Sequence, residues 1–405
     1  MDFCIARQPI FNFNKRLYAY ELLYRGNGEW NLDNTEGSRA TSSLLSSTFM
    51  TEGIEKVTGS KPCFVNFTQE LLLKNIHPAF PKNRLVIEIL EDVEPTVEVV
   101  AACQQMVNQG YTLALDDFIY HPKFDPLIEL ASIIKVDFLL TPVDGLAKML
   151  HKLSRFDHIK LLAEKVETYE EFDKALKLGF SFFQGYFFSR PEELHIKELS
   201  SVKINLLRLL AEVSQKKTTI TRLEKIVSAD VALTYKLLRF LNSAHFYLLE
   251  KVESVSRAIS FLGGKRFRHF VMLILISEIA SDKPEELVRL AVVRAKFCEL
   301  LAEQGSLKKH SGELFLVGLF SLIDAMLDKP MKDLLSALPL MNDVKIALVD
   351  DEGPYAPVLN AVKNYEQSLK EPCLKNLKQV HVKPQAVGRI YLQAVEYGEQ
   401  LLVDC

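Results

Sequence analysis

Two adjacent carboxylates, Asp116 and Asp117, close a short apolar run that begins at Thr112. Like charges at the end of a strand repel each other, so the pair is unfavourable unless a neighbouring cation offsets the repulsion. A divalent metal ion would supply that charge, because Mg²⁺ prefers oxygen ligands. The doublet therefore predicts metal-dependent chemistry at this point of the chain.

Other strand-like runs in the first half of the chain also end in an oxygen-bearing side chain. These side chains are Glu21, Asn66, Glu88, Glu164 and Gln184. In a barrel the carboxyl ends of the strands share one face, so the side chains would converge there. Such ligands favour Mg²⁺ or Mn²⁺ over zinc, with Ca²⁺ as a non-productive competitor. Two ions about 3.5–4 Å apart would suit phosphodiester hydrolysis. For any single carboxylate the alternative is a solvated loop residue.

Two cationic residues accompany these oxygens. Lys135 ends a further strand-like run, where an ammonium could position the attacking water. Arg25 follows Glu21 and could pair with a phosphate. The alternative for Lys135 taken alone is a surface lysine with its stem on apolar neighbours.

The elements that must position these residues alternate between short β-rich runs and helical patterns. Strands are predicted at residues 17–23, 63–67, 85–89, 112–115, 133–136, 160–163 and 182–187, with helices such as 97–109 and 169–178 between them. The alternation predicts an α/β domain over residues 1–195, a TIM-like (β/α)₈ barrel. A doubly wound sheet is the alternative that the pattern alone leaves open. Gly110 and Gly179 are predicted to end helices.

After Pro191 strand-like runs give way to helical periodicity. The predicted helices are 203–214, 222–228, 232–241, 255–262, 287–303 and 315–327. Thr221 and Glu224 fit a capping box, and Gly263 and Gly305 are predicted to end helices. Residues 200–395 are therefore predicted to form an all-helical domain, with the junction near 192–200.

Bulk properties narrow the function classes. The 405 residues suffice for two domains, and 48% hydrophobic with 25% charged residues is ordinary for globular proteins. A net charge of −3 gives no basic signature, so no nucleic-acid polymer is expected as partner. The start lacks a signal-peptide layout, and the apolar stretch at 270–276 is too short to span a bilayer. The six cysteines form no C-x-x-C pair. We expect a cytoplasmic protein with reduced thiols and no membrane insertion.

Taken in order, these residues resemble the EAL family of cyclic di-GMP phosphodiesterases. The motifs that carry the resemblance are Glu21-Leu-Leu-Tyr-Arg25, the Asn66 strand, Glu88-Ile-Leu-Glu91, Asp116-Asp117-Phe118, Lys135-Val-Asp137, Ala163-Glu-Lys-Val-Glu-Thr168 and Gln184-Gly-Tyr186. Each motif is short, but their common order over residues 1–191 makes the resemblance specific.

The resemblance implies roles for individual residues. Two Mg²⁺ or Mn²⁺ ions would be held by Glu21, Asn66, Glu88, Asp116, Asp117 and Glu164. Lys135 and Gln184 would orient the hydrolytic water, with Glu167 as a supporting carboxylate. Substrate would be contacted by Arg25, Leu23, Gln8 and Pro9, and Glu91 would anchor the loop after Asp117. The implied reaction converts cyclic di-GMP to linear pGpG, with Ca²⁺ inhibitory.

Three departures from the family pattern bear on turnover. Leu22 replaces alanine in the signature, and Lys165 replaces glycine beside Glu164. The Gly-rich loop that follows the Asp-Asp-Phe motif is replaced by residues 119–124, beginning with Ile119. A non-hydrolysing receptor for cyclic di-GMP, or a protein adaptor, is therefore the alternative to the enzyme.

The helical half resembles the HDOD domain, a relative of the HD phosphohydrolases that lacks their metal ligands. The resemblance rests on residues 226–244 and 252–263. His245, His269 and His310 stand apart from one another, so no hydrolytic site is expected here. The resemblance implies regulation of the barrel and a protein partner, and it leaves a homodimer open.

Overall fold

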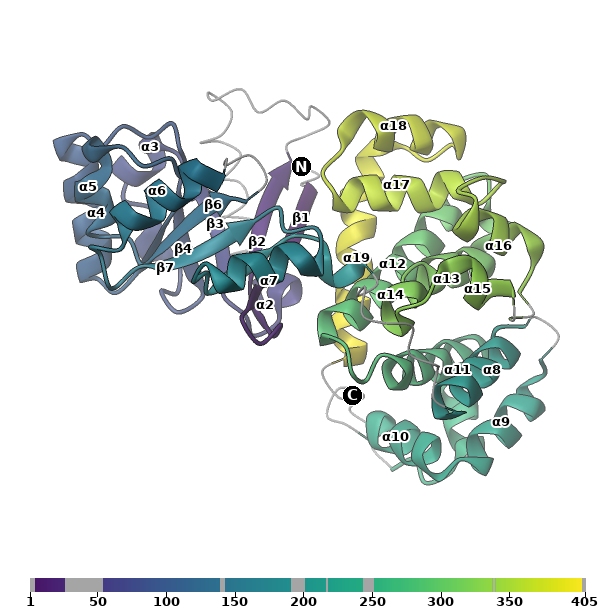
Figure 1. The fold of residues 1–405 in the computed structure, drawn as a ribbon. Coiled ribbons are helices and arrows are strands. Elements are labelled where there is room, and N and C mark those ends of the chain that lie inside the picture. The colour runs from purple at the N-terminus through teal and green to yellow at the C-terminus, as the bar shows by residue number, and fades with distance from the viewer. Residues whose placement is uncertain are drawn as a thin grey trace. The chain divides into compact units, whose positions relative to one another are not determined.

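A computed structural model describes residues 4–25, 54–138, 143–190, 201–215, 218–242, 251–336, 338 and 340–402 (Figure 1). The chain divides into two compact units. The first comprises Met1–Arg190 with Pro384–Leu392, and the second comprises Pro191–Lys383 with Gln393–Cys405. The predicted junction, near 192–200, lies outside the described residues.

Eight strands of the first unit form a closed barrel in chain order. They are β1 (Cys4–Asn12), β2 (Leu17–Arg25), β3 (Cys63–Phe67), β4 (Leu85–Ile89), β5 (Thr112–Leu115), β6 (Ile133–Asp137), β7 (Lys160–Glu164) and β8 (Phe182–Gln184). Closure confirms the predicted barrel and excludes the doubly wound sheet.

β1 is the strand that the pattern did not predict. Arg7, Gln8 and Pro9 interrupt its apolar run, so the sequence lacks the usual strand signal. β1 runs antiparallel to both β2 and β8, whereas β2 to β8 pair in parallel. β8 is also shorter than predicted, because Gly185 turns the chain and residues 187–189 form a 3₁₀ helix.

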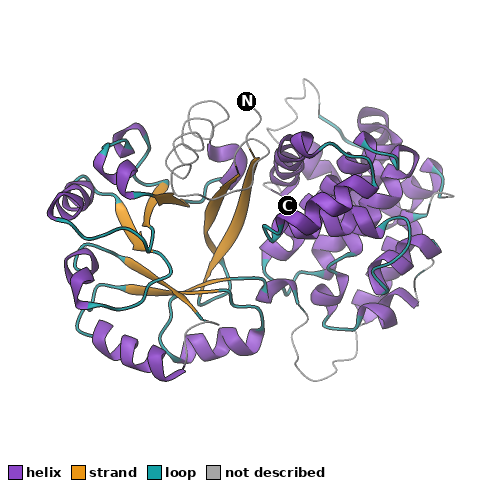
Figure 2. Cartoon of the chain, turned by 90° about the horizontal axis from the view of Figure 1, so that it is seen from above, coloured by secondary structure: helices purple, strands orange, loops and turns teal. Residues whose placement is uncertain are grey.

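Helices surround the strands of the first unit (Figure 2). They are α2 (Ile54–Thr58), α3 (Gln69–Leu73), α4 (Val97–Asn108), α5 (Asp125–Ile128), α6 (Val143–Leu153) and α7 (Tyr169–Lys177), with 3₁₀ turns η2 (His77–Ala79), η3 (Pro122–Phe124) and η4 (Phe187–Ser189). Thr168 and Glu171 form a capping box at the start of α7. Gly110 and Gly179 follow the ends of α4 and α7, as predicted.

The floor of the barrel is one apolar layer, to which every strand contributes a buried residue. This core layer consists of Ile10, Ala19, Phe64, Val86, Ala114, Ile133, Leu162 and Phe182, with Tyr18 stacked on Phe182 at 4.2 Å. Side chains alternate between the two faces of a strand, so residues two positions away point into the barrel as well. The core layer therefore determines which residues lie directly above it.

The second unit is helical throughout its described part, as predicted. Its helices are α8 (Ser201–Ser214), α9 (Ile220–Ala229), α10 (Val231–Leu241), α11 (Val255–Ile279), α12 (Glu285–Gln304), α13 (Ser311–Phe320), α14 (Ile323–Leu327), α15 (Met331–Ser336), α16 (Asn342–Val349), α17 (Ala356–Glu366), α18 (Lys370–Gln379) and the C-terminal part of α19 (Pro384–Leu402), with the 3₁₀ turn η6 (Lys308–His310). The first part of α19, up to Leu392, is counted with the first unit. Within the described ranges, no helix is both long and apolar enough to cross a bilayer.

Three details of helix ends in this unit qualify the predictions. The cap of α9 is Thr219, whose side chain accepts from the Arg222 N–H, so the predicted cap at Thr221 is wrong. Gly263 breaks the helical path within α11 and Gly305 caps α12.

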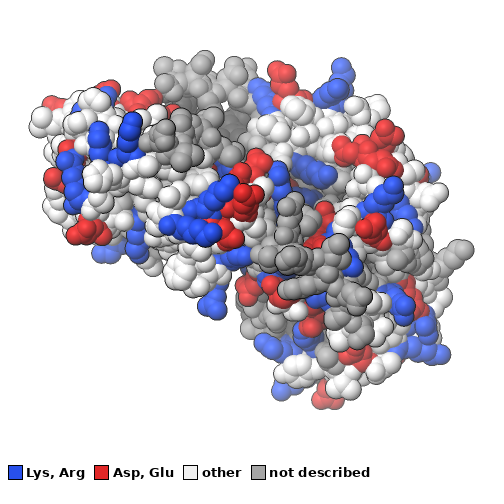
Figure 3. Space-filling model, in the orientation of Figure 1, with Lys and Arg blue, Asp and Glu red and all other residues white. Residues whose placement is uncertain are grey.

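On the face shown in Figure 3, basic and acidic side chains are interspersed.

Candidate active site

A layer of polar side chains lies directly above the core layer. Each member is two residues away from a core-layer residue, on the side nearer the carboxyl ends of β2 to β8. This polar layer consists of Gln8, Glu21, Asn66, Glu88, Asp116, Lys135, Glu164 and Gln184. On the antiparallel strand β1 the step runs towards the N-terminus, and it places Gln8 opposite Glu21. The strand period of two thus brings residues from all eight strands together.

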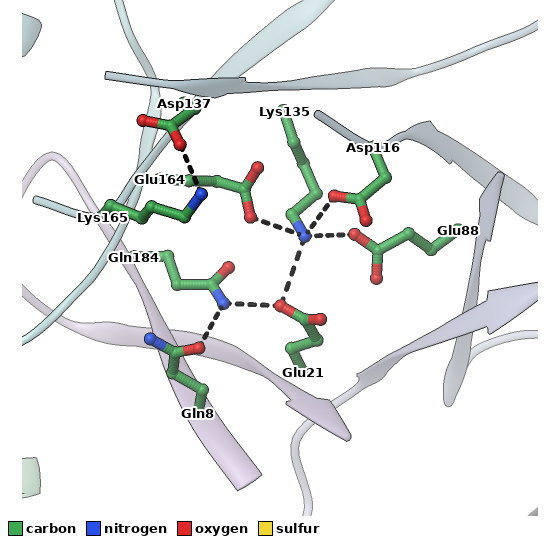
Figure 4. A network of polar contacts seen from close by, with 9 residues as sticks. All are labelled: Gln8, Glu21, Glu88, Asp116, Lys135, Asp137, Glu164, Lys165 and Gln184. Atoms are coloured by element: carbon green, nitrogen blue, oxygen red, sulfur yellow. Dashed lines mark hydrogen bonds and ion pairs between the residues drawn. The ribbon is translucent and has the colours of Figure 1, made fainter. Parts of the chain in front are cut away.

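Lys135 lies at the centre of the polar layer (Figure 4). Its side chain is 1% exposed, and its Nζ lies 3.2 Å from Glu21 Oε2, 2.9 Å from Asp116 Oδ1 and 2.9 Å from Glu164 Oε1. A fourth ion pair joins it to Glu88, which is fully buried. One ammonium therefore faces four carboxylates, and it cannot neutralise them all.

The excess of carboxylates changes the protonation of the layer. Burial raises the pKa of Glu88 well above its usual range, and burial raises the pKa of Glu164 to about 8, although Lys135 acts against both shifts. Burial alone would lower the pKa of Lys135, but the four carboxylates hold it well above its usual range. The ammonium therefore stays charged while protons are retained on part of the carboxyl set.

Gln184 connects β8 and β1 to the layer. Its Nε2 donates to Gln8 Oε1 at 3.0 Å and to Glu21 Oε2 at 2.6 Å. The following Gly185 has no room for a side chain, because a Cβ there would collide with the backbone of Val166. This close approach lets the Val166 N–H donate to the Gln184 carbonyl at 3.0 Å and holds the ends of β7 and β8 together.

Above the polar layer lies an outer group of Asp117, Asp137 and Lys165. The ammonium of Lys165 pairs with Asp137 Oδ2 (Figure 4). Asp117 lines a cavity of about 550 Å³ together with Asp137 and Glu91. Asp117 reaches solvent, yet burial of its carboxyl raises its pKa, Asp116 raises it further, and Lys165 acts in the opposite sense. No role was predicted for Asp137; the signal in the sequence was its place two residues after Lys135, on the same face of β6.

The buried oxygens of the polar layer fit divalent metal ions. Four of them are buried and accept no hydrogen bond from any described residue: Asn66 Oδ1, Glu88 Oε2, Glu164 Oε2 and Gln184 Oε1. Buried oxygens without donors are unfavourable unless a cation binds them. Among the described side chains, no three of His, Cys, Asp or Glu yet have the spacing of a formed metal site.

The remaining predicted residues are Glu167, Leu23, Pro9 and Arg25. The Glu167 carboxylate pairs with Arg190 at 2.6 Å. Leu23 lies two residues beyond Glu21 and so on the same face of β2, whereas Pro9 is buried on the face of β1 opposite to Gln8. Arg25 ends β2, and its side chain lies outside the described part of the structure.

The loop after Asp117 is held by polar contacts around Tyr120. The Tyr120 hydroxyl donates to Asp125 Oδ1 at 3.2 Å and accepts from Arg155 at 2.9 Å. Arg155 also pairs with Asp125 at 2.5 Å, and Lys152 Nζ lies 4.7 Å from the centre of the Tyr120 ring. Ile119, by contrast, is 81% exposed. The replacement for the family's Gly-rich loop is thus an ordered loop with an apolar side chain in solvent.

Comparisons with known proteins agree with this architecture. Residues 54–191 match the EAL domain family and residues 199–335 match the HDOD domain family. The cyclic di-GMP phosphodiesterase CdgJ of Vibrio cholerae serotype O1 is 37% identical over 378 residues, which cover 92% of this chain and 87% of that protein. YuxH of Bacillus subtilis is 36% identical over 406 residues, 98% of each chain.

Among solved structures, the Bacillus subtilis YkuI protein, with an EAL domain and in complex with substrate c-di-GMP and calcium, is also similar. It is 20% identical, with a TM-score of 0.39, covering 64% of this chain and 71% of that one. The matched EAL residues begin at 54, yet the barrel also includes β1 and β2, which bring Gln8 and Glu21. On the near full-length relatives and the two matched domains, the chain belongs to the family of proteins in which an EAL domain is followed by an HDOD domain.

Proposed function

We propose that this protein is a metal-dependent phosphodiesterase that hydrolyses cyclic di-GMP to pGpG. The observation that carries the proposal is the polar layer, in which four buried oxygens lack donors around a carboxylate-bound ammonium. The relative named a cyclic di-GMP phosphodiesterase, at 37% identity, supports the same substrate.

The position of each site residue indicates its role in this reaction. Glu21, Asn66, Glu88, Asp116, Asp117 and Glu164 would hold two Mg²⁺ or Mn²⁺ ions, with Ca²⁺ inhibitory. When bound, the ions supply Lewis acidity for a water nucleophile and stabilise the leaving oxygen. Gln184, oriented by Gln8, and Lys135 would hold the attacking water in line with the phosphate. Arg25 would bind a phosphate and Glu91 would support the loop beside Asp117.

The helical unit would regulate the barrel in the cytoplasm and dock a protein partner. His269 is buried against Phe315, with ring centres 3.8 Å apart, and His310 lies beside Tyr355. The contact of His269 is that of a packed side chain, and His310 is exposed, which supports a non-hydrolytic role for this unit.

A second candidate function is a receptor or adaptor without turnover. It is favoured by the loop after Asp117, where polar contacts fix Tyr120 and where Ile119 occupies a position that the family gives to a flexible loop. Such a protein would bind cyclic di-GMP and release no product.

One assay separates the two functions. Purified full-length protein is incubated with Mn²⁺ and cyclic di-GMP, and pGpG is followed by chromatography. We expect product from the wild type and a loss of at least about 100-fold in Glu21→Gln, because that residue contacts both Lys135 and Gln184. Glu170→Gln, on the exposed surface of α7, is the matched control and should keep full activity. Retained activity in Glu21→Gln would contradict the phosphodiesterase, and binding without product would favour the receptor.

A further inference from the structure

Lys165 occupies a backbone position that disfavours any side chain. Its φ is +56°, in the left-handed region that glycine adopts freely and lysine rarely does. It follows Glu164 directly at the end of β7, so its backbone turns the chain where the polar layer ends. A lysine at such a strained position points to a function for its charge.

The ammonium of Lys165 forms an ion pair within the outer group, as the ammonium of Lys135 does within the polar layer. It pairs with Asp137, whose side chain is 9% exposed, while its own side chain is 51% exposed. Asp117 and Asp137 line the same cavity, so the ammonium lies beside the second carboxylate of the outer group as well. The two lysines thus divide the carboxylates into an inner set and an outer pair.

The outer pair is where a second cation has open access. Asp117 and Asp137 line one cavity of about 550 Å³ with Glu91, whereas Lys135 is enclosed by the polar layer. A divalent ion entering through this cavity meets Asp117 and Asp137, and Asp137 is already paired with Lys165. Because Lys165 is half exposed and its stem is flexible, its ammonium can be displaced and does not block the site.

We propose that Lys165 is a tethered cation that competes with the second divalent ion for Asp117 and Asp137, so that this chain loads its two ions in steps of unequal affinity. The inference rests on the proposed two-ion site. The first ion binds among the buried oxygens of the polar layer, and Lys165 sets the metal concentration at which the second ion completes the site.

Calorimetric titration with Mn²⁺ at a fixed pH of about 8 tests the competition, with stoichiometry checked by the electron paramagnetic resonance of free Mn²⁺. Wild type should show one strong and one weak step. Lys165→Gly and Lys165→Gln should tighten the weak step by about tenfold and leave the strong step unchanged, since one partly exposed positive charge is removed. The matched control is Lys148→Gln, which lines the same cavity without an ion pair to Asp117 or Asp137 among the described residues. It should titrate as wild type.

Each outcome decides the proposal. Equal steps in wild type, an unchanged weak step in the Lys165 variants, or an equal shift in Lys148→Gln would overturn it. Lys165→Gly should melt no lower than wild type, because glycine suits its φ, so misfolding is detected separately. The pGpG assay at saturating Mn²⁺ distinguishes the two levels: a tightened weak step without product overturns only the phosphodiesterase, and product without a tightened step overturns only the role of Lys165. Absence of Mn²⁺ binding in all variants overturns both.

Discussion

The carboxyl of Glu164 is held protonated by its surroundings. Its pKa of about 8 in the folded protein lies far above 4.5, the ordinary value, because the side chain is buried among other carboxylates. A raised carboxyl pKa stabilises the folded state below the unfolded value and loses that contribution as pH rises through the folded value. In the metal-free protein, Glu164 therefore contributes least to the stability of the folded state at alkaline pH.

The first prediction concerns this dependence. In the presence of a chelator, wild-type stability should decline between about pH 4.5 and pH 8 relative to Glu164→Gln, with a slope of at most about 1.4 kcal/mol per pH unit. Thermal melting of both proteins across this range measures the difference. Parallel pH profiles of the two proteins would contradict it. Saturating Mn²⁺ should remove the difference in slope, because the ligand must then be deprotonated at every pH.

His269 in the second unit shows the opposite sign. Burial lowers its pKa to about 4, and the nearby charge of Glu299 only partly opposes this. The unfolded chain takes up its proton near pH 6.5, before the folded protein does, so stability is lost as pH falls from 6.5 to about 4. The loss is on the order of 3 kcal/mol.

The second prediction is that His269→Phe removes this acid sensitivity. The ring lies parallel to Phe315 at 5° and borders a cavity of about 770 Å³, so phenylalanine can keep the stack. Denaturant unfolding of the full chain at pH 4.5 and pH 7 compares the two proteins. A variant that loses as much stability at pH 4.5 as wild type does would show that other groups cause the sensitivity.

At the scale of elements, the ordered loop between β5 and α5 depends on a residue of another segment. Arg155, beyond the end of α6, holds both Tyr120 and Asp125. Because the Arg155 side chain is half exposed, solvent screens its contacts, and they add little to global stability. Their effect should therefore be local.

The third prediction follows from this exposure. Arg155→Ala should speed amide hydrogen exchange at residues 118–124 by about fivefold and leave the midpoint of global denaturant unfolding unchanged. Lys174→Ala, which removes an ion pair of similar exposure on α7, is the control and should leave this loop unchanged. Unaltered exchange in Arg155→Ala would mean that the backbone alone orders the loop.

The strands differ in how far the sequence predicts them. β3 to β7 are apolar runs flanked by turns, so their positions are evident from composition. β1 is not, since Pro9 and its polar neighbours hide an alternation that becomes visible only when Ile10 is placed in the core layer. For the same reason Gln8 could be predicted only through the family resemblance. The spacing from Ala19 to Glu21, repeated on every parallel strand, is a signal that the sequence does contain.

Side-chain partners were less predictable than positions. The convergence of Glu21, Glu88 and Glu164 follows from strand ends meeting at one face. The pairing of Lys165 with Asp137 does not, because it depends on a left-handed backbone at residue 165 that lysine seldom adopts. The ion pair of Glu167 with Arg190 likewise joins residues 23 positions apart, and no spacing in the sequence indicates it.

At the scale of the whole molecule, the two units have separate cores, and the polar layer belongs to the first. Calorimetry of the full chain should therefore resolve two transitions, and this is the fourth prediction. Mn²⁺ at about 100 times its dissociation constant should stabilise one transition by about 2.7 kcal/mol and leave the other unchanged.

Core substitutions assign the transitions. Leu113→Ala in β5 should lower the free energy of unfolding of the metal-sensitive transition by about 2–5 kcal/mol. Leu314→Ala in α13 should lower that of the other transition by a similar amount, because both leucines are fully buried. A single transition, or one metal shift common to both, would show that the units unfold together.

The reversed strand β1 has a consequence for the order of events during synthesis. Its hairpin with β2 joins residues close in sequence, but Ile10 cannot meet its partner Gln184 until nearly the whole barrel has been translated. Translation proceeds at about 5–20 residues per second, so the edge of β1 that pairs with β8 stays unpaired for roughly ten seconds or longer. Gln8 and Gln184 reach each other only at this closing step. The pairing of β1 with β8 closes the barrel and completes the polar layer in the same step. A nascent chain therefore cannot have a complete site before its barrel has closed.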